Sequence, residues 1–325
     1  MNENNKLLEV INLKTYFPIN RGIFSRTVGY VRAVDDVSLY IEPKETVGLV
    51  GESGCGKTTL GRTILGLEKP NAGKIVFDGN DICSISRKEM RNLRKRIQIV
   101  FQDPIASLNP RMNILDIITE GIIEFNMVNG YSDIKDQAIR LLNEVGLDDT
   151  ALYRYPHEFS GGQKQRINIA RAISLKPDFI VCDEPVSALD VSIQAQVINL
   201  LMDLQDSHNL SYLFISHDLN IVSHIANRVA VMYFGKIVEQ GETEEIMTNP
   251  LHPYTQTLLD AVISPGKSRN KKIKLYGDVS SSMNPSGCVF SPRCPKALSL
   301  CRKEPPREKI IQTRKVMCHN YGKND

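Results

Sequence analysis

The sequence contains no tryptophan, and aromatic residues make up only 6% of its 325 positions. Its charges nearly cancel, with 40 Lys and Arg against 37 Asp and Glu. Nucleic-acid binders usually carry a larger basic excess, or a basic stripe interleaved with aromatic residues. We therefore expect no nucleic-acid partner.

The sequence also lacks a long apolar segment. No uninterrupted apolar run approaches the roughly 20 residues that a helix needs to cross a bilayer. The first ten residues are polar and asparagine-rich, without the basic stretch and apolar core of a secretion signal. We expect a chain that stays in the cytosol and reaches a membrane only through a partner or its surface.

Cysteine is present seven times, an odd count that argues against a disulfide framework in a reducing compartment. Four cysteines crowd the C-terminal region, with five, six and sixteen residues between successive members: Cys288, Cys294, Cys301 and Cys318. Four thiolates in a cytosolic chain suggest zinc or an iron–sulfur cluster. The spacing lacks the Cys-x-x-Cys pair of common zinc ribbons, and free structural thiols are a third possibility.

The length favours one large domain with an appendage. Residues 7–17 and 33–41 alternate apolar and polar positions, as half-buried antiparallel strands do. Further along, short apolar runs alternate with helical patterns, which predicts a largely parallel, buried sheet of the α/β class. A helical lobe at about 103–160 is predicted to be inserted between core strands, and the basic segment 267–274 is interpreted as a linker.

The apolar run 46–50 leads into a glycine-rich loop and then a helical pattern at 57–67. The loop is a complete phosphate-binding motif in its required context, which argues against a chance glycine turn. Its backbone N–H groups can curl around phosphate oxygens at the positive end of the helix. Lys57 suits the β- and γ-phosphates, and Thr58 suits Mg²⁺. The predicted nucleotide-binding residues are Gly51, Glu52, Ser53, Gly54, Cys55, Gly56, Lys57, Thr58 and Thr59.

Polar side chains follow three other apolar runs of the predicted sheet. Asp183 and Glu184 end the run 179–182, where ligands bind at the carboxyl ends of parallel strands. We predict that Asp183 holds Mg²⁺ and that Glu184 polarises the attacking water. His217 should reach the same edge, and the amide of Gln102 suits a reversible Mg²⁺ or water contact. An acidic turn and a structural histidine are the plainer alternatives.

A second anion-binding turn is formed by Ser160, Gly161, Gly162 and Gln163 at a predicted helix start. One nucleotide does not need two glycine-rich phosphate-binding turns, so this turn is predicted to bind a different nucleotide. A flexible helix cap is the alternative for these four residues taken alone.

Together these motifs resemble, from Leu7 to about Gly241, the ATP-binding subunits of ABC transporters. The resemblance implies a P-loop ATPase core with an antiparallel β subdomain and an inserted helical subdomain. It also implies that two subunits pair head to tail around Mg·ATP, with Asp190 at their interface. Phe17 best fits the aromatic residue that stacks on adenine, with Tyr16 and Tyr30 as alternatives.

The segments 249–255 and 287–295 resemble the C-terminal extension of oligopeptide and dipeptide importer ATPases, closest to the oligopeptide-permease F type. This predicts an ABC-type domain at 1–248 and an extension at 249–325. The implied partners are a homologous second ATPase subunit, two transmembrane permease subunits and an extracellular or periplasmic substrate-binding protein. The chain would then lie on the cytoplasmic face of the membrane as a peripheral subunit.

The function implied by this resemblance is ATP hydrolysis that powers peptide import. Nickel importers share the extension and give an alternative cargo. A soluble ABC-type ATPase acting on ribosomes or DNA is a second alternative, disfavoured because such chains carry two ATPase units or long coiled-coil insertions. A regulatory subunit without hydrolysis is disfavoured by Glu184 and His217. For the four C-terminal cysteines, the resemblance favours a [4Fe–4S] cluster, with Zn²⁺ as the alternative.

Overall fold

The computed structural model describes residues 6–22, 26–128, 130–263 and 286–321. The linker predicted at 267–274 lies outside the described residues. The chain divides into two compact units. The first unit contains Met1–Leu8, Ile41–Thr46 and Phe77–Ile215, and the second contains Glu9–Tyr40, Val47–Val76 and Ser216–Asp325. These two units are not separated at residue 248, where the sequence predicts a domain boundary. That boundary stays a prediction.

The first unit is built on three adjacent parallel strands, in the order β6 (Ile97–Val100), β7 (Phe179–Asp183) and β8 (Ser211–Ser216). Every residue of β7 and β8 is buried. Strands covered on both faces need continuous apolar runs, which is the pattern of this part of the sequence. The expected parallel sheet is confirmed here.

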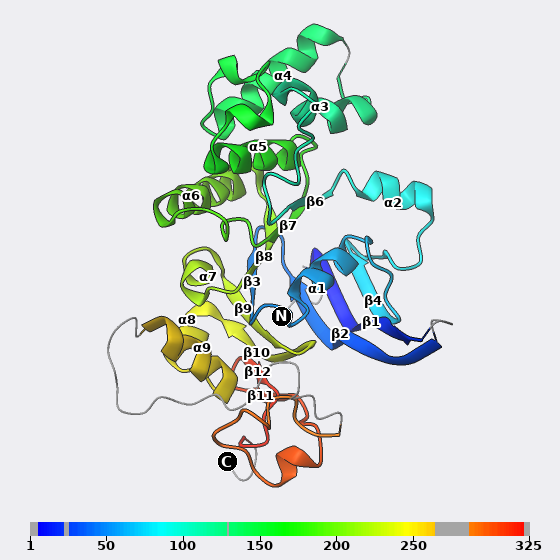
Figure 1. Cartoon of the computed structure of the whole chain (residues 1–325), viewed down its shortest axis with the longest axis vertical. Helices are drawn as coiled ribbons and strands as arrows, with labels where there is room; N and C mark the ends of the chain where they lie inside the picture. The colour runs from blue at the N-terminus through cyan, green and yellow to red at the C-terminus, as the bar shows by residue number, and fades with distance from the viewer. Residues whose placement is uncertain (1–5, 23–25, 129, 264–285, 322–325) are drawn as a thin grey trace. The chain divides into compact units, whose positions relative to one another are not determined.

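Helices make up most of the rest of the first unit (Figure 1). Helix α3 begins after Asn113, whose side chain accepts a hydrogen bond from the backbone N–H of Asp116 at 2.9 Å. It packs against α4 and α5, because its apolar face needs cover from water. The elements are β5 (Asn80–Asp81), α2 (Arg87–Leu93), α3 (Ile114–Glu124), α4 (Tyr131–Glu144), η1 (Asp149–Ala151), η2 (Pro156–Glu158), α5 (Gly161–Ile173) and α6 (Val191–His208).

The second unit contains its own run of paired strands. Strand β3 (Thr46–Val50) lies parallel to β9 (Arg228–Tyr233), and β9 pairs antiparallel with β10 (Lys236–Glu242). The turn between β9 and β10 has positive φ at both Phe234 and Gly235, as a two-residue hairpin turn requires. Beyond β10 lie two strands from the C-terminal part of the chain, β12 (Arg314–Val316) and β11 (Lys309–Ile311).

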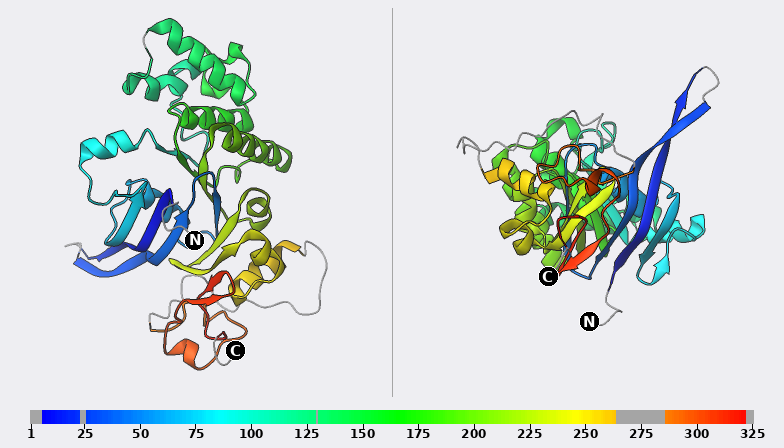
Figure 2. Two further views of the ribbon diagram at one scale, coloured as in Figure 1. Left: turned by 180° about the vertical axis from the view of Figure 1, so that it is seen from behind. Right: turned by 90° about the horizontal axis from the view of Figure 1, so that it is seen from below.

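A second sheet in this unit places β1 (Leu8–Arg21) between β2 (Arg26–Ile41) and β4 (Ala72–Phe77). Strands β1 and β2 form a long ribbon that is longer than the sequence pattern predicts (Figure 2). The helices are α1 (Lys57–Ile64), α7 (Leu219–Ile225), α8 (Thr243–Thr248), α9 (Pro253–Ile263) and η4 (Leu300–Arg302). In the described part of the chain, no helix is long and apolar enough to span a membrane.

Candidate functional site

The glycine loop connects β3 to α1 in the second unit. Gly56, at the N-cap of α1, has a φ of 110°, and a Cβ built there would lie 1.9 Å from the carbonyl oxygen of Ala33. Gly54 also has a positive φ, of 79°, with nothing within 4 Å of the place of a Cβ. A side chain would be strained at both positions and would clash at Gly56, so glycine suits a loop whose backbone N–H groups can bind an anion at the start of the helix.

Lys57 is the first residue of α1 and is only 4% exposed. Its ammonium group donates hydrogen bonds to the carbonyl oxygens of Gly51 at 2.7 Å and Glu52 at 3.1 Å. The charge is therefore held over the loop that the sequence predicts to receive phosphate. An ammonium with three donors can exchange these neutral acceptors for phosphate oxygens, which carry full negative charge.

Glu52 has contacts that sequence analysis did not predict. Its backbone N–H donates to the hydroxyl of Tyr254 at 2.9 Å. Its carboxylate accepts two hydrogen bonds from the guanidinium of Arg293, at 2.8 and 3.0 Å. Tyr254 and Arg293 lie in the two C-terminal motifs, which carried a family resemblance in the sequence but no assigned role.

The acidic pair lies at the carboxyl end of β7 in the first unit. Asp183 is 5% exposed and Glu184 is 8% exposed. Glu184 has a φ of 48°, which lies in the left-handed region that residues other than glycine, asparagine and aspartate seldom adopt. The carbonyl of Ile215 accepts its N–H at 3.0 Å, and the carbonyl of Glu184 accepts the hydroxyl of Ser187 at 3.1 Å. These bonds hold the residue in a conformation of the kind found at functional sites.

Gln102 lies just after β6 and reaches this pair. Its amide nitrogen donates to a carboxylate oxygen of Glu184 at 3.2 Å. The structure therefore brings together Gln102 and Glu184, two residues assigned to hydrolysis from the sequence. The amide nitrogen of Gln102 faces Glu184, so the amide oxygen is the atom that can bind a cation.

The second predicted anion grip lies at the start of α5 in the first unit. The Ser160 hydroxyl accepts the N–H of Gln163 at 3.3 Å, and the Gln163 side chain accepts the N–H of Ser160 at 3.0 Å. This capping box keeps the helix start in one geometry. Ser160, Gly161 and Gln163 are exposed, and Gly162 is half-buried. A Cβ on Gly162 would lie 2.5 Å from a methyl carbon of Ile193.

Two further predicted residues lie at element ends. Asp190 is the exposed N-cap residue of α6 in the first unit, and its side chain makes no capping hydrogen bond. His217 is exposed and lies in the second unit, between β8 and α7. The roles assigned to both residues stay predictions.

Comparison with known proteins decides the family. Residues 34–187 match the family model described as ABC transporter, and residues 238–301 match the one described as oligopeptide/dipeptide transporter, C-terminal region. The chain is 51% identical over 324 residues to the oligopeptide transport ATP-binding protein AppF of Bacillus subtilis strain 168, covering 97% of this chain and 98% of that protein. The chain belongs to the ABC transporter family.

Two more similarities extend this result. The dipeptide transport ATP-binding protein DppF of Haemophilus influenzae is 48% identical over 94% of this ABC ATPase and 93% of its own length. A solved structure, described as a bacterial ABC transporter cassette in dimeric form, superposes with a TM-score of 0.64 at 25% identity, covering 73% of this chain and 98% of that one. The P-loop ABC fold and the ATPase activity expected from the sequence are confirmed.

The aromatic residues considered for adenine stacking lie on the β1–β2 ribbon of the ABC ATPase. The Tyr16 hydroxyl donates to the carboxylate of Asp35 at 2.5 Å, and burial together with that contact raises the pKa of Tyr16 to about 12. Phe17 is 37% exposed and Tyr30 is 58% exposed. Phe17 and Tyr30 are therefore both partly accessible to a ligand, whereas the hydroxyl of Tyr16 is bound to Asp35.

The four C-terminal cysteines of the ABC ATPase are neighbours in the second unit. Burial raises the pKa of Cys288 to about 11, and the other three thiols are near enough to add to the shift. Among the described residues, no three His, Cys, Asp or Glu side chains are arranged to hold a metal ion. The structure therefore does not support the predicted iron–sulfur or zinc site.

Proposed function

We propose that this chain is the ATP-hydrolysing subunit that powers import of oligopeptides or dipeptides through a membrane ABC transporter. The observation that carries the proposal is the 51% identity to AppF across 97% of the chain. This identity extends through the C-terminal region, where residues 238–301 match the oligopeptide/dipeptide transporter model. An ABC cassette without this region would leave the cargo class open.

Hydrolysis in this proposal depends on several of the residues predicted from the sequence. Lys57 and the N–H groups of the glycine loop bind the phosphates of ATP, and Glu184 takes a proton from the attacking water. Gln102, whose amide nitrogen donates to Glu184 at 3.2 Å, orients that carboxylate. His217 is proposed to contact the γ-phosphate. Phe17 is proposed to stack on adenine.

Mg²⁺ is expected to accompany ATP and would neutralise charge on its phosphates. Asp183, Thr58 and Gln102 each carry a side-chain oxygen of the kind that binds a hard cation. Asp183 is 5% exposed. Asp183 also lies at the carboxyl end of an apolar strand, which is where ligands bind in parallel sheets.

The exposed helix start at Ser160 supports a role in a dimer. Its free surface and fixed capping geometry suit binding of ATP held by the glycine loop of a second ATPase subunit, with Asp190 at the same interface. We propose a related but different ATPase chain as the partner. The pair would act on two transmembrane permease subunits, which receive their cargo from a substrate-binding protein. This chain would then lie peripherally on the cytoplasmic side of the membrane.

The experiment that tests the proposal is reconstitution of the subunit with co-purified membrane partners in proteoliposomes. We expect ATP-dependent uptake of a labelled peptide, and no uptake with a Lys57→Ala variant. Uptake of nickel without uptake of peptides would assign the cargo to the alternative importer class. Co-purification with ribosomes instead of membrane proteins would refute a transport function.

A metal cluster at the cysteines remains a prediction to be tested chemically. The proximity of Cys288 to Cys294, Cys301 and Cys318 motivates the test, because cysteine sulfur is a usual ligand of both zinc and iron–sulfur clusters. Iron, sulfide and zinc analysis of the purified chain separates the alternatives. Bound iron with sulfide would support a cluster, and less than stoichiometric iron and zinc would refute both metals.

A further inference from the structure

The two C-terminal motifs meet at the glycine loop. Tyr254 comes from the segment 249–255 and Arg293 from the segment 287–295, and both contact Glu52. All three residues belong to the second unit. Glu52 is the second residue of the phosphate-binding loop, so a part of the chain about 240 positions away in sequence contacts the nucleotide site directly.

Arg293 binds the Glu52 carboxylate with both terminal nitrogens, at 2.8 and 3.0 Å. The arginine is 6% exposed, and one of its nitrogens also donates to the Tyr233 hydroxyl at 3.3 Å. Two parallel N–H···O bonds fix the orientation of a carboxylate as well as its position. This ion pair therefore restricts the rotation of the Glu52 side chain.

Glu52 is held at each of its polar groups. Arg293 binds the carboxylate, Tyr254 accepts the N–H at 2.9 Å, and Lys57 donates to the carbonyl oxygen at 3.1 Å. Lys57 is also the residue expected to bind the β- and γ-phosphates. A displacement of Glu52 would therefore move an acceptor of the phosphate-binding lysine.

The groups behind Glu52 form a rigid base. The Tyr254 ring lies 4.6 Å from that of Tyr233 and 5.4 Å from that of Phe290, measured between centroids. Tyr233, Tyr254 and Phe290 are each at most 1% exposed. Packed aromatic rings of this kind have few alternative positions. The Tyr254 hydroxyl is thus presented to the loop from a fixed point.

We propose that Arg293 and Tyr254 are positioning residues for ATP hydrolysis, which hold the glycine loop through Glu52 in the geometry that receives the phosphates. The C-terminal region is then part of the nucleotide site and not only an attached segment. This inference rests on the proposed hydrolysis of ATP at Lys57. The competing explanation is that the contact merely fastens the C-terminal region to the rest of the unit.

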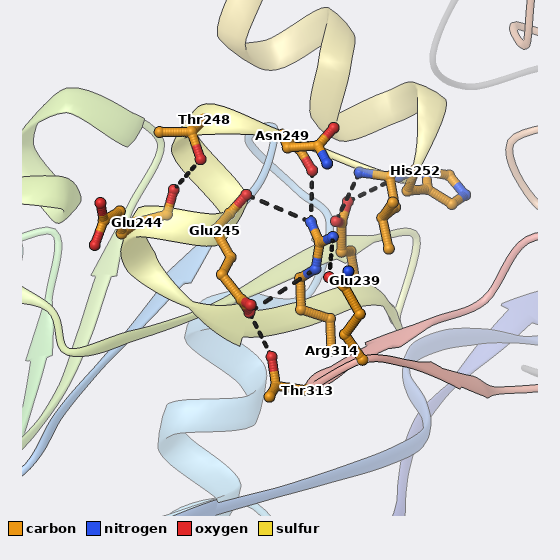
Figure 3. Close-up of polar contacts among 10 residues, drawn as sticks. Glu239, Glu244, Glu245, Thr248, Asn249, His252, Thr313 and Arg314 are labelled. Carbon is orange, nitrogen blue, oxygen red and sulfur yellow. Dashed lines mark hydrogen bonds and ion pairs between the residues drawn. The ribbon is translucent and has the colours of Figure 1, made fainter.

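Arg314 offers a matched control for that explanation (Figure 3). It is also buried, at 2% exposed, and its guanidinium donates to the carbonyl oxygens of Asn249 at 2.5 Å and Glu245 at 3.4 Å. These contacts fasten β12 to α8 in the same unit, and none of the contacts of Arg314 drawn in Figure 3 involves the glycine loop. Substitution of Arg314 should loosen the C-terminal region without displacing Glu52.

The test compares full-length Arg293→Gln, Arg293→Lys, Tyr254→Phe and Arg314→Lys variants. Binding of a non-hydrolysable ATP analogue with Mg²⁺ is measured by calorimetry, KM and kcat by phosphate release, and folding by the thermal midpoint. Charged hydrogen bonds of this type are worth enough to shift Kd about tenfold, so Arg293→Gln should raise Kd and KM by that factor with a smaller change in kcat. Arg293→Lys should recover part of the loss, and Tyr254→Phe should raise Kd about threefold.

The Arg314→Lys variant should melt earlier yet bind the analogue as the unmodified chain does. In a double-mutant cycle, Glu52→Gln combined with Arg293→Gln should bind no more weakly than either single variant, because both remove one interaction. A folded Arg293→Gln variant with unchanged Kd would overturn the inference, as would equal weakening by Arg314→Lys. Failure of the unmodified chain to bind the analogue would instead refute ATP binding itself.

Discussion

A buried histidine should make the stability of the second unit depend on pH. His252 is 1% exposed, and its Nδ1 accepts the backbone N–H of Tyr254 at 3.1 Å. Burial disfavours the imidazolium and lowers the pKa of His252 from its ordinary value of 6.5 to about 3. The neutral ring is therefore required in the folded state, whereas the unfolded chain takes up a proton below pH 6.5.

The sign and size of the effect follow from this difference. Because the folded pKa is lowered, the stabilisation is fully present above pH 6.5 and is lost as the pH falls, at about 1.4 kcal/mol per pH unit. Between pH 7.5 and pH 5.0, the loss from His252 should be about 2 kcal/mol. An Asn at this position can place a side-chain oxygen near Nδ1 but cannot be protonated, so His252→Asn should remove this part of the pH dependence.

The assay is native-state hydrogen exchange of the α9 amides, which reports the free energy of opening in that part of the unit. We expect the unmodified chain to lose about 2 kcal/mol more than His252→Asn between the two pH values. Groups that titrate elsewhere cancel in this comparison. The same pH dependence in both proteins would show that His252 is protonated without cost in the folded chain, and would refute this account.

Three further predictions concern the nucleotide site. Glu184→Gln should keep ATP binding and trap a stable dimer while kcat falls by about 10² to 10⁴, the usual contribution of a general base, and unchanged phosphate release would remove Glu184 from that role. Gly56→Ala should lose binding of the ATP analogue in calorimetry, because the new Cβ would lie 1.9 Å from the Ala33 carbonyl oxygen, and normal affinity would show that the loop adjusts at little cost. Ser160→Ala should lower dimer-dependent hydrolysis, measured by phosphate release. Loss of the cap should also destabilise α5 by about 1 kcal/mol, measured by hydrogen exchange. Full activity would argue that this turn does not bind an anion.

The sequence by itself determined the parallel core and the identity of the motifs. The apolar runs that became β3, β7 and β8 were recognisable because strands buried on both faces need uninterrupted apolar residues. The glycine loop was recognisable because its chemistry requires fixed residue types at fixed spacing. The carboxyl-end rule also placed Gln102 near Glu184, and the 3.2 Å contact agrees with that expectation.

Tertiary structure alone decided what the C-terminal region contacts. The ion pair between Arg293 and Glu52 joins positions 241 residues apart, and no local pattern encodes such a pairing. The sequence spacing of the cysteines likewise could not show that burial keeps Cys288 protonated, because that depends on the packing around the thiol. Local patterns arise from hydrogen bonds and periodicity within a few residues, whereas these contacts depend on how distant segments fill the same space.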